Sequence, residues 1–460
     1  MVGGFKLSAG SLSLLAAAGV LLVGGTSAQA ADLGGNCCAD LEERIAELEA
    51  TTARKGNRKV KLEVSGQVNE MVLFWDDGEE SNVGVYTNDA SRTRFRFKGD
   101  AKIADGWKAG YLLEIGVRSA NSKRFNQDDP TGETGLDLRH STWYVDSKSF
   151  GRFWVGLTGG AAESITEINV AGTGDVAKYS DAEDIGGGLA LRLANGTYSS
   201  GGTSVTSGDI TIRRLIRDSG NQPGEGRRYN MVRYDTPEIA GFTATVNWGA
   251  DDAWEMGLRY KGEFAGLKLA AGIAYGESSE PVGGSPSGTP SNTVGFECVA
   301  NRTTNANIAG TGKDADCHQV GGSISVMHEA TGLYTNFAAG FLEDELIKKR
   351  FGAGADDRHE FWAVEAGIQR KWLPLGKTTI FGQYYNNQGG ETDRSYTGIG
   401  RLAGSELDIY SLGVMQGVDA AAMNFYAMYR HVEAEADTVA GDHLEFQDVD
   451  MFMTGAIIKF

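Results

Sequence analysis

From Lys59 to the C-terminus, apolar residues recur at every second position of many short segments. Val60, Leu62 and Val64 begin the pattern, and the stretch 242–248 (FTATVNW) repeats it in the middle of the chain. Successive side chains of a strand point to opposite faces, so a period of two gathers the apolar residues on one face. The pattern predicts an all-β protein built from many amphipathic strands.

The connections between these segments alternate in length. Short turns are expected at 104–106, 147–149, 237–240, 263–265, 331–332, 373–376 and 418–421. Mostly longer loops are expected at 76–90, 120–135, 158–226, 250–253, 276–318, 343–358, 388–405 and 434–442. Seven turns and eight loops join sixteen strands, and turns on one side with long loops on the other are typical of outer-membrane barrels. The predicted fold is a sixteen-stranded antiparallel transmembrane β-barrel with short periplasmic turns and long outer loops.

The stretch Ser91–Gly99 (SRTRFRFKG) shows what such a barrel would contain. Arg92, Arg94 and Arg96 share one face of a strand, and two phenylalanines lie on the other. A row of unpaired cations is almost never buried in a soluble core, whereas a barrel of sixteen strands encloses water. We therefore expect the arginines to face the lumen and the phenylalanines to face lipid.

The N-terminal region predicts export. Residues 1–30 have the cationic start, apolar core and A-x-A site of a secretory signal peptide, with cleavage expected after Ala30. Residues 31–58 form a periplasmic segment, in which Leu41–Leu48 carries a short heptad-type stripe. This stripe predicts either a small self-association helix or a mobile linker. The barrel is expected to occupy 59–460, because 31–58 is too short for a plug or passenger domain.

The cysteines suggest one intrachain disulfide. Cys298 and Cys317 lie in one polar loop, and a bond between them would contribute about 3 kcal/mol in the chain-entropy model. A zinc site that includes His318 is the weaker alternative, so no metal is expected. Cys37 and Cys38 are consecutive and are expected to form an intermolecular disulfide or none.

Charge and motifs exclude several functions. The formal net charge is -18, which argues against nucleic acid as a partner and, by concentrating cations at the mouth, predicts a weak preference for cations. The six histidines are scattered, and the chain lacks a G-x-S-x-G, H-E-x-x-H or P-loop motif. No cofactor is expected, and an enzyme built on a barrel is the less favoured alternative to a channel.

Several longer stretches resemble one family. These are LRHSTWYVDSKSFGRFWVGLTGG (138–160), YSDAEDIGGG (179–188), RRYNMVRYDTPEIAGFTATVNWG (227–249) and the C-terminal MFMTGAIIKF. With them, nearly all of the mature chain resembles the alphaproteobacterial general porin family. The resemblance implies a trimeric outer-membrane channel for passive diffusion of small hydrophilic solutes and ions, in contact with lipid and lipopolysaccharide. A porin biased toward sugars or anions is the alternative. Phe460 and Ile458 resemble the terminal signal that the outer-membrane assembly machinery recognises.

The same resemblance implies a pore constriction. In this family the third outer loop folds inward, and here the third loop, 158–226, is the longest. Its acids are expected to face a basic wall across the narrowest part of the pore and so create a transverse field. The expected basic wall is Arg92, Arg94, Arg96, Arg152 and Arg233, and the expected loop acids are Asp175, Asp181, Glu183 and Asp184.

Overall fold

The computed structural model describes residues 60–216, 222–249, 253–278, 317–344, 356–390 and 395–460. The chain divides into Met1–Arg58 and Lys59–Phe460, and every described residue belongs to the second unit. The expected signal peptide, N-terminal segment, Cys37, Cys38 and Cys298 lie outside the described residues, so these predictions stay predictions.

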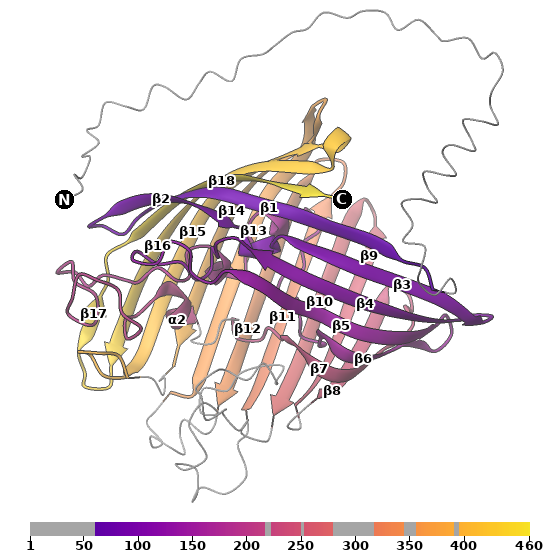
Figure 1. Ribbon diagram of the computed structural model, residues 1–460, viewed down its shortest axis with the longest axis horizontal. Helices are drawn as coiled ribbons and strands as arrows, with labels where there is room; N and C mark the ends of the chain where they lie inside the picture. Colours follow the sequence, from indigo (N-terminus) through magenta and orange to yellow (C-terminus); the bar gives the residue numbers. More distant parts are fainter. Residues whose placement is uncertain (1–59, 217–221, 250–252, 279–316, 345–355, 391–394) are drawn as a thin grey trace, which may run out of the picture. The chain divides into compact units, whose positions relative to one another are not determined.

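The second unit is a ring of antiparallel strands (Figure 1). Its segments are β1 (Glu63–Asp76), β2 (Ser81–Thr87), β3 (Arg94–Ala104), β4 (Trp107–Arg118), β5 (Gly135–Ser147), β6 (Gly151–Gly159), β7 (Arg228–Asp235), β8 (Phe242–Gly249), β9 (Trp254–Phe264), β10 (Leu267–Ser278), β11 (Cys317–His328), β12 (Leu333–Asp344), β13 (Arg358–Leu373), β14 (Gly376–Gly389), β15 (Leu402–Val418), β16 (Met423–Thr438), β17 (His443–Glu445) and β18 (Val449–Lys459). β2 and β3 both pair with β1, and β17 and β18 both pair with β16. Each of these two pairs is one interrupted barrel strand, so the 18 segments form sixteen barrel strands. β18 pairs with β1 and closes the ring, which confirms the predicted fold class.

The interruption between β2 and β3 corrects one expected loop. The sequence predicted a loop over 76–90, but Ser81–Thr87 is a strand that pairs with β1. The strand then breaks at the 3-10 helix η1 (Asp89–Ser91), where the side chain of Asn88 accepts the N–H of Ala90 at 3.0 Å. β3 therefore begins at Arg94, and Arg92 precedes the strand.

The outward face of the barrel is apolar. Phe74, Trp143 and Trp248 are each about half exposed, while their strand neighbours on the other face are buried or polar. Phe95 and Phe97 lie on the face of β3 opposite Arg94 and Arg96 and contact each other with ring centroids 5.7 Å apart. Such a face suits lipid. In the described ranges, no helix is long and apolar enough to cross a membrane.

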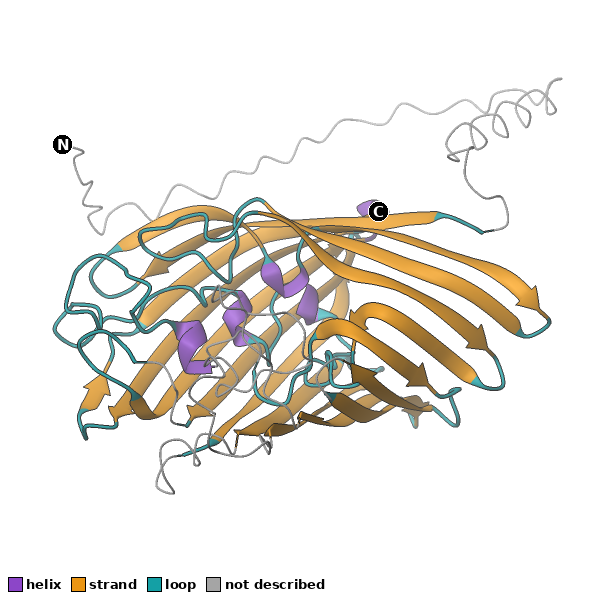
Figure 2. Cartoon of the chain, turned by 60° about the horizontal axis from the view of Figure 1, so that its bottom comes forward, coloured by secondary structure: helices purple, strands orange, loops and turns teal. Residues whose placement is uncertain are grey.

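The third loop, which joins β6 to β7 and is called L3 below, folds into the ring. It carries the 3-10 helices η2 (Thr173–Asp175) and η3 (Ala182–Asp184) and the short helix α2 (Ile212–Ile216), which lie within the ring of strands (Figure 2). A further 3-10 helix, η7 (Asp419–Ala421), forms the turn between β15 and β16. The inward-folded third loop confirms this part of the fold prediction.

Candidate functional site

L3 is fastened to the inner wall by hydrogen bonds along its length. The N–H groups of Ile168 and Val170 donate to Ser323 Oγ (3.2 Å) and Ser325 Oγ (2.9 Å) of β11. Farther along, Arg430 Nη1 of β16 donates to the carbonyls of Ala182 (2.6 Å) and Ile185 (3.1 Å). These bonds hold the loop against β11 at one point and against β16 at another.

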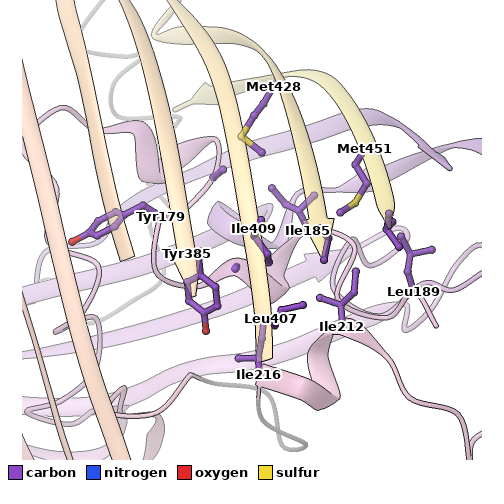
Figure 3. Packing of buried hydrophobic residues seen from close by; sticks show 14 of the residues in the cluster. Tyr179, Ile185, Leu189, Ile212, Ile216, Tyr385, Leu407, Ile409, Met428 and Met451 are labelled. Carbon is purple, nitrogen blue, oxygen red and sulfur yellow. The ribbon is translucent and has the colours of Figure 1, made fainter. Parts of the chain in front are cut away.

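Apolar packing holds the same side of L3. Tyr179, Ile185, Leu189, Ile212 and Ile216 of L3 share one cluster with Tyr385, Leu407, Ile409, Met428 and Met451 of β14–β18 (Figure 3). All ten side chains are buried, and they belong to the largest apolar cluster of the described residues. L3 therefore covers the inner wall at β14–β18, and the charged part of the lumen lies along β3–β9.

Close packing explains the glycines of the loop. A Cβ atom at Gly188 would lie 2.3 Å from the carbonyl oxygen of Phe125, in the second outer loop. Only glycine allows these two backbones to approach so closely. The GGG sequence at 186–188 thus lets L3 turn beneath the second loop.

Arginines line the charged part of the lumen. Arg94 and Arg96 of β3 lie beside Arg139 of β5, and all three surround Glu114 of β4. The Glu114 side chain is only 1% exposed and accepts from Arg96 Nε and Arg139 Nε, both at 2.7 Å. One buried carboxylate therefore orders three guanidinium groups.

A second group of basic side chains continues this surface. Arg152 of β6 lies over the rings of Tyr144 (4.7 Å) and Trp154 (5.1 Å), and Arg233 of β7 lies 6.0 Å from the Trp154 ring. The aromatic rings stabilise both cations through cation–π contacts. Arg259 of β9 donates to the carbonyls of Ala161 and Glu163 in L3.

These side chains border one cavity. A cavity of about 730 Å³ is lined by Arg152, Arg233 and Arg259, with Asp146 and Asp235 as its inner acids. Arg233 Nε donates to Asp235 (2.8 Å), and Arg152 Nε donates to Asp146 (3.1 Å). Arg228, the first residue of β7, lies near Arg94 and Arg139. We call Arg94, Arg96, Arg139, Arg152, Arg228, Arg233 and Arg259 the arginine wall.

Of the five arginines that the sequence singled out, four belong to this wall and Arg92 lies apart. Arg92 binds Asp89 at 3.0 Å and Asp137 at 2.8 Å, and its side chain is 14% exposed. It lies at the break between β2 and β3, where it shares the carboxylates of Asp89 in η1 and Asp137 in β5 with Arg118.

Three of the predicted loop acids are buried in an ionic cluster. Asp181, Glu183 and Asp184 are almost inaccessible; Lys178 binds Asp181 (2.6 Å) and Asp184 (3.2 Å), and Lys123 binds Glu183 (3.1 Å). Burial and the neighbouring Asp181 carboxylate raise the pKa of Glu183 well above its ordinary value. Burial alone would also raise the pKa of Asp181, but Lys178 and Lys123 hold it below its usual range. The cluster joins L3 to the second loop.

The fourth predicted acid, Asp175, lies at the inner wall near the end of the chain. Asp175 Oδ2 contacts Lys459 Nζ at 2.5 Å, and Asn69 Nδ2 donates to the Asp175 carbonyl at 3.0 Å. Its side chain is 22% exposed, more than those of the buried acids. Glu163, near the start of L3, pairs with Arg228 at the edge of the arginine wall.

Sequence reasoning missed Glu114, Arg139, Arg228 and Arg259 as site residues. Arg259 could have been predicted from the sequence, because it shares the polar face of a regular strand with Lys261. Arg139 could not be predicted from alternation, because it is the extra residue of a β-bulge. Glu114 pairs with His140, whereas the next residue, Ile115, pairs with Leu138. A bulge re-aims side chains and breaks the simple alternation.

The remaining predicted residues lie at the edges of the barrel. Cys317 is disulfide-bonded, and its expected partner Cys298 lies outside the described residues. Phe460 exchanges both backbone hydrogen bonds with Gly66 (2.8 and 3.0 Å), and Ile458 pairs with Val68 on the outward face. The last residues of the chain thus complete the seam between β18 and β1.

Comparison with known proteins identifies the class. The chain matches the Gram-negative porin family over residues 15–447 and belongs to that family. No curated protein sequence matches it. Together with the closed sixteen-stranded ring, membership makes it a bacterial outer-membrane β-barrel that forms a diffusion channel.

Solved structures with similar folds include three outer-membrane proteins. The anion-selective porin from Comamonas acidovorans is 14% identical, with a TM-score of 0.50, 87% of this chain covered and 100% of that one. OmpT of Vibrio cholerae is 12% identical (TM-score 0.48, coverage 88% and 99%). OmpF of Salmonella typhi, solved in complex with daunomycin, is 12% identical (TM-score 0.45, coverage 87% and 98%).

Proposed function

We propose that this channel passes small hydrophilic solutes and ions through a passage bounded by the arginine wall on one side and by L3 on the other. The observation that carries the proposal is the uneven interior of the barrel. L3 packs on the apolar inner face of β14–β18, whereas the inner face of β3–β9 carries the charged side chains. In this proposal the chain is a channel and not an enzyme, and 158–226 is its constriction loop.

We propose that the passage prefers anions, the opposite of the preference expected from the net charge. The acids that form ion pairs with the arginine wall are fewer than its seven arginines: Glu114, Asp146, Glu163 and Asp235. Asp181, Glu183 and Asp184 are enclosed with two lysines, so they hold the shape of L3 and contribute little to the field in the passage. A lumen with an excess of one charge concentrates the opposite ion.

The proposal assigns the constriction to specific residues. Arg94, Arg96, Arg152 and Arg233 form its basic side, and Asp175 with Glu163 forms its acidic side. Arg92 is assigned to the break between β2 and β3. The cavity beside Arg152 and Arg233 favours, as a second candidate, a channel biased toward anionic solutes.

Recording single channels across a planar bilayer with a salt gradient tests this function. We expect stepwise, long-lived openings and a reversal potential of the anion-selective sign. The double variant R94Q/R96Q should shift the reversal potential toward cations. R358Q removes a cation from an exposed position at the outer end of β13 and should leave the potential unchanged. Silence from folded protein would contradict the channel, and a cation-selective wild type would contradict the role of the arginines.

We also propose a homotrimer, supported by an outward-facing carboxylate. Glu70 alternates with the buried Asn69 and Met71 of β1, so it lies on the outer face of the barrel. It accepts from Thr93 Oγ1 (2.9 Å), Thr87 Oγ1 (3.0 Å) and Ser119 Oγ (3.2 Å). A charged group on the lipid face is costly at membrane depth, so this polar group is better accommodated against another subunit.

Cross-linking in mild detergent tests the trimer. Wild-type protein should give a three-subunit band, and Glu70→Arg should reduce it while the β-sheet circular dichroism is retained. Monomer alone from the wild type would remove the proposal. Lipid and lipopolysaccharide are proposed to cover the rest of the outer face, and the assembly machinery is proposed to recognise Phe460 and Ile458.

A further inference from the structure

The outward face of β15–β18 carries unusual charge near the outer loops. Between Tyr410 and Tyr429 and the outer loops, this face carries eight acids: Glu406, Asp408, Glu433, Glu435, Asp437, Glu445, Asp448 and Asp450. The described residues of this face include no lysine or arginine. The basic groups among the described residues of this face are two histidines, His431 and His443, against eight acids.

His431 lies among these acids, and its two ring nitrogens contact different carboxylates. Its neighbours Arg430 and Val432 are buried inside the barrel, so His431 faces outward. Nδ1 lies 2.8 Å from Asp450 Oδ1, the atom that also accepts from the Tyr429 hydroxyl at 2.5 Å. Asp450 therefore holds the Nδ1 side of the ring, and Nε2 points at Glu433 Oε1, so a cation bound there would replace the proton between these two atoms.

Nε2 of His431 lies close to two carboxylates. Nε2 lies 3.2 Å from Glu433 Oε1 and 3.9 Å from Asp448 Oδ2, and the three donor atoms all lie within 4.8 Å of one another. A tetrahedral zinc ion with bonds of about 2.1 Å holds its ligand atoms about 3.4 Å apart. The separation between Nε2 and Glu433 is close to this spacing, and the separation between Nε2 and Asp448 is about 0.5 Å longer.

We propose that His431, Glu433 and Asp448 bind a divalent transition-metal ion of the zinc class on the outer face of the barrel. One imidazole nitrogen with two carboxylates suits zinc better than calcium or magnesium, which prefer oxygen ligands only. A histidine ligand held through its other nitrogen by a carboxylate is the usual support of such a site. The fourth coordination position faces away from the protein and is open to water or to an anionic group outside the barrel.

The ion would join two parts of the closing strands. His431 and Glu433 belong to β16, whereas Asp448 lies in the interruption between β17 and β18. A bound ion would therefore bridge this interruption and stabilise the outer end of the last barrel strand. The site faces away from the lumen, so its occupancy is separate from the proposed ion preference.

Zinc binding to the full-length mature protein tests the proposal. The protein is refolded without a histidine tag, treated with a chelator, dialysed, and titrated with Zn²⁺ at 150 mM NaCl and 5 mM Mg²⁺. We expect one saturable ion per chain and a higher unfolding temperature with zinc. Asp450→Asn keeps the three ligands and should weaken binding about 10- to 100-fold. His431→Ala should abolish saturable binding while single-channel conductance stays unchanged.

His443→Ala is the matched control, because His443 lies on the same face with its Nδ1 2.8 Å from Asp437. It should bind zinc as the wild type does. Equal losses in the His431 and His443 variants would show diffuse attraction by the acids and overturn the proposal. Absence of saturable zinc binding to folded wild type under these conditions would overturn it as well.

Discussion

Glu114 is the residue whose replacement should change the channel most, because it is the shared carboxylate of three arginines. Glu114→Gln keeps the shape of the side chain and removes the charge that Arg96 and Arg139 contact at 2.7 Å. Removing one partner of a buried ion pair typically costs about 3–5 kcal/mol, so the unfolding midpoint should fall. The lumen also gains one net positive charge.

The size of the electrical effect follows from Coulomb's law. At a separation on the order of 5 Å in water, a unit charge changes the energy of a passing ion by about 0.8 kcal/mol. Screening at 0.1 M salt leaves roughly 0.5 kcal/mol. Because anions and cations shift in opposite directions, the ratio of anion to cation permeability should rise about fivefold.

The assay is the reversal potential of single channels in a salt gradient, compared for wild type and E114Q. E435Q removes one negative charge from the outward face of β16 and serves as the control. The control should match the wild type, while E114Q should move toward the potential of an ideal anion channel. An unchanged potential in E114Q, or a shift toward cations, would refute the assignment of the passage to the arginine wall.

Three further predictions concern L3 and the seam. Burial raises the pKa of Glu167 to about 7. Between pH 4.5 and pH 7 the carboxyl is therefore protonated in the folded protein and ionised in the unfolded chain. The free energy that holds L3 in place should therefore fall by at most roughly 3 kcal/mol as the pH rises through that window. The frequency of brief channel closures should differ between pH 5 and pH 8 in the wild type but not in E167Q. A Cβ atom at Gly321 would lie 2.1 Å from the Gly224 carbonyl oxygen of L3, so G321A should enlarge the single-channel conductance, whereas G382A, with its nearest atom at 3.8 Å, should not. Deleting Phe460 should lower the amount of folded protein in the outer-membrane fraction, and unchanged amounts would contradict its role in assembly.

The strands were predictable because their signals are local. Alternation and turn residues can be read within one segment, and pairing of neighbours along the chain follows from short connections. The strand Ser81–Thr87 was missed although Val83 and Val85 alternate within it, because it follows the acidic run 76–80 and was read as part of one loop. Its pairing with β1 shows that the loop ends before Ser81.

The site was predictable only in part, because charge is visible in a sequence but its partners are not. Arg94 and Arg96 follow from the period of two, and the structure places both on the lumenal face. The same reasoning treated Glu183 as a charge that faces the pore. In the structure its carboxylate lies 3.1 Å from Lys123, a residue of the second loop that is distant in sequence. A charged residue on an inward-folded loop can serve packing as easily as permeation.

The strands on which L3 docks also differ from the other strands in their sequence pattern. Strands that face lipid outside and water inside alternate apolar with polar residues, as β3 and β9 do. Strands covered on both faces lose that alternation. In β15, the inward Ile409 is followed by the outward Tyr410 and Leu412, and in β18 the inward Met451 and Met453 flank the outward Phe452. Both faces of these two strands are apolar because one meets lipid and the other meets L3. Loss of alternation on the last strands therefore indicates where the loop packs, and the strands that keep it indicate where water and ions pass.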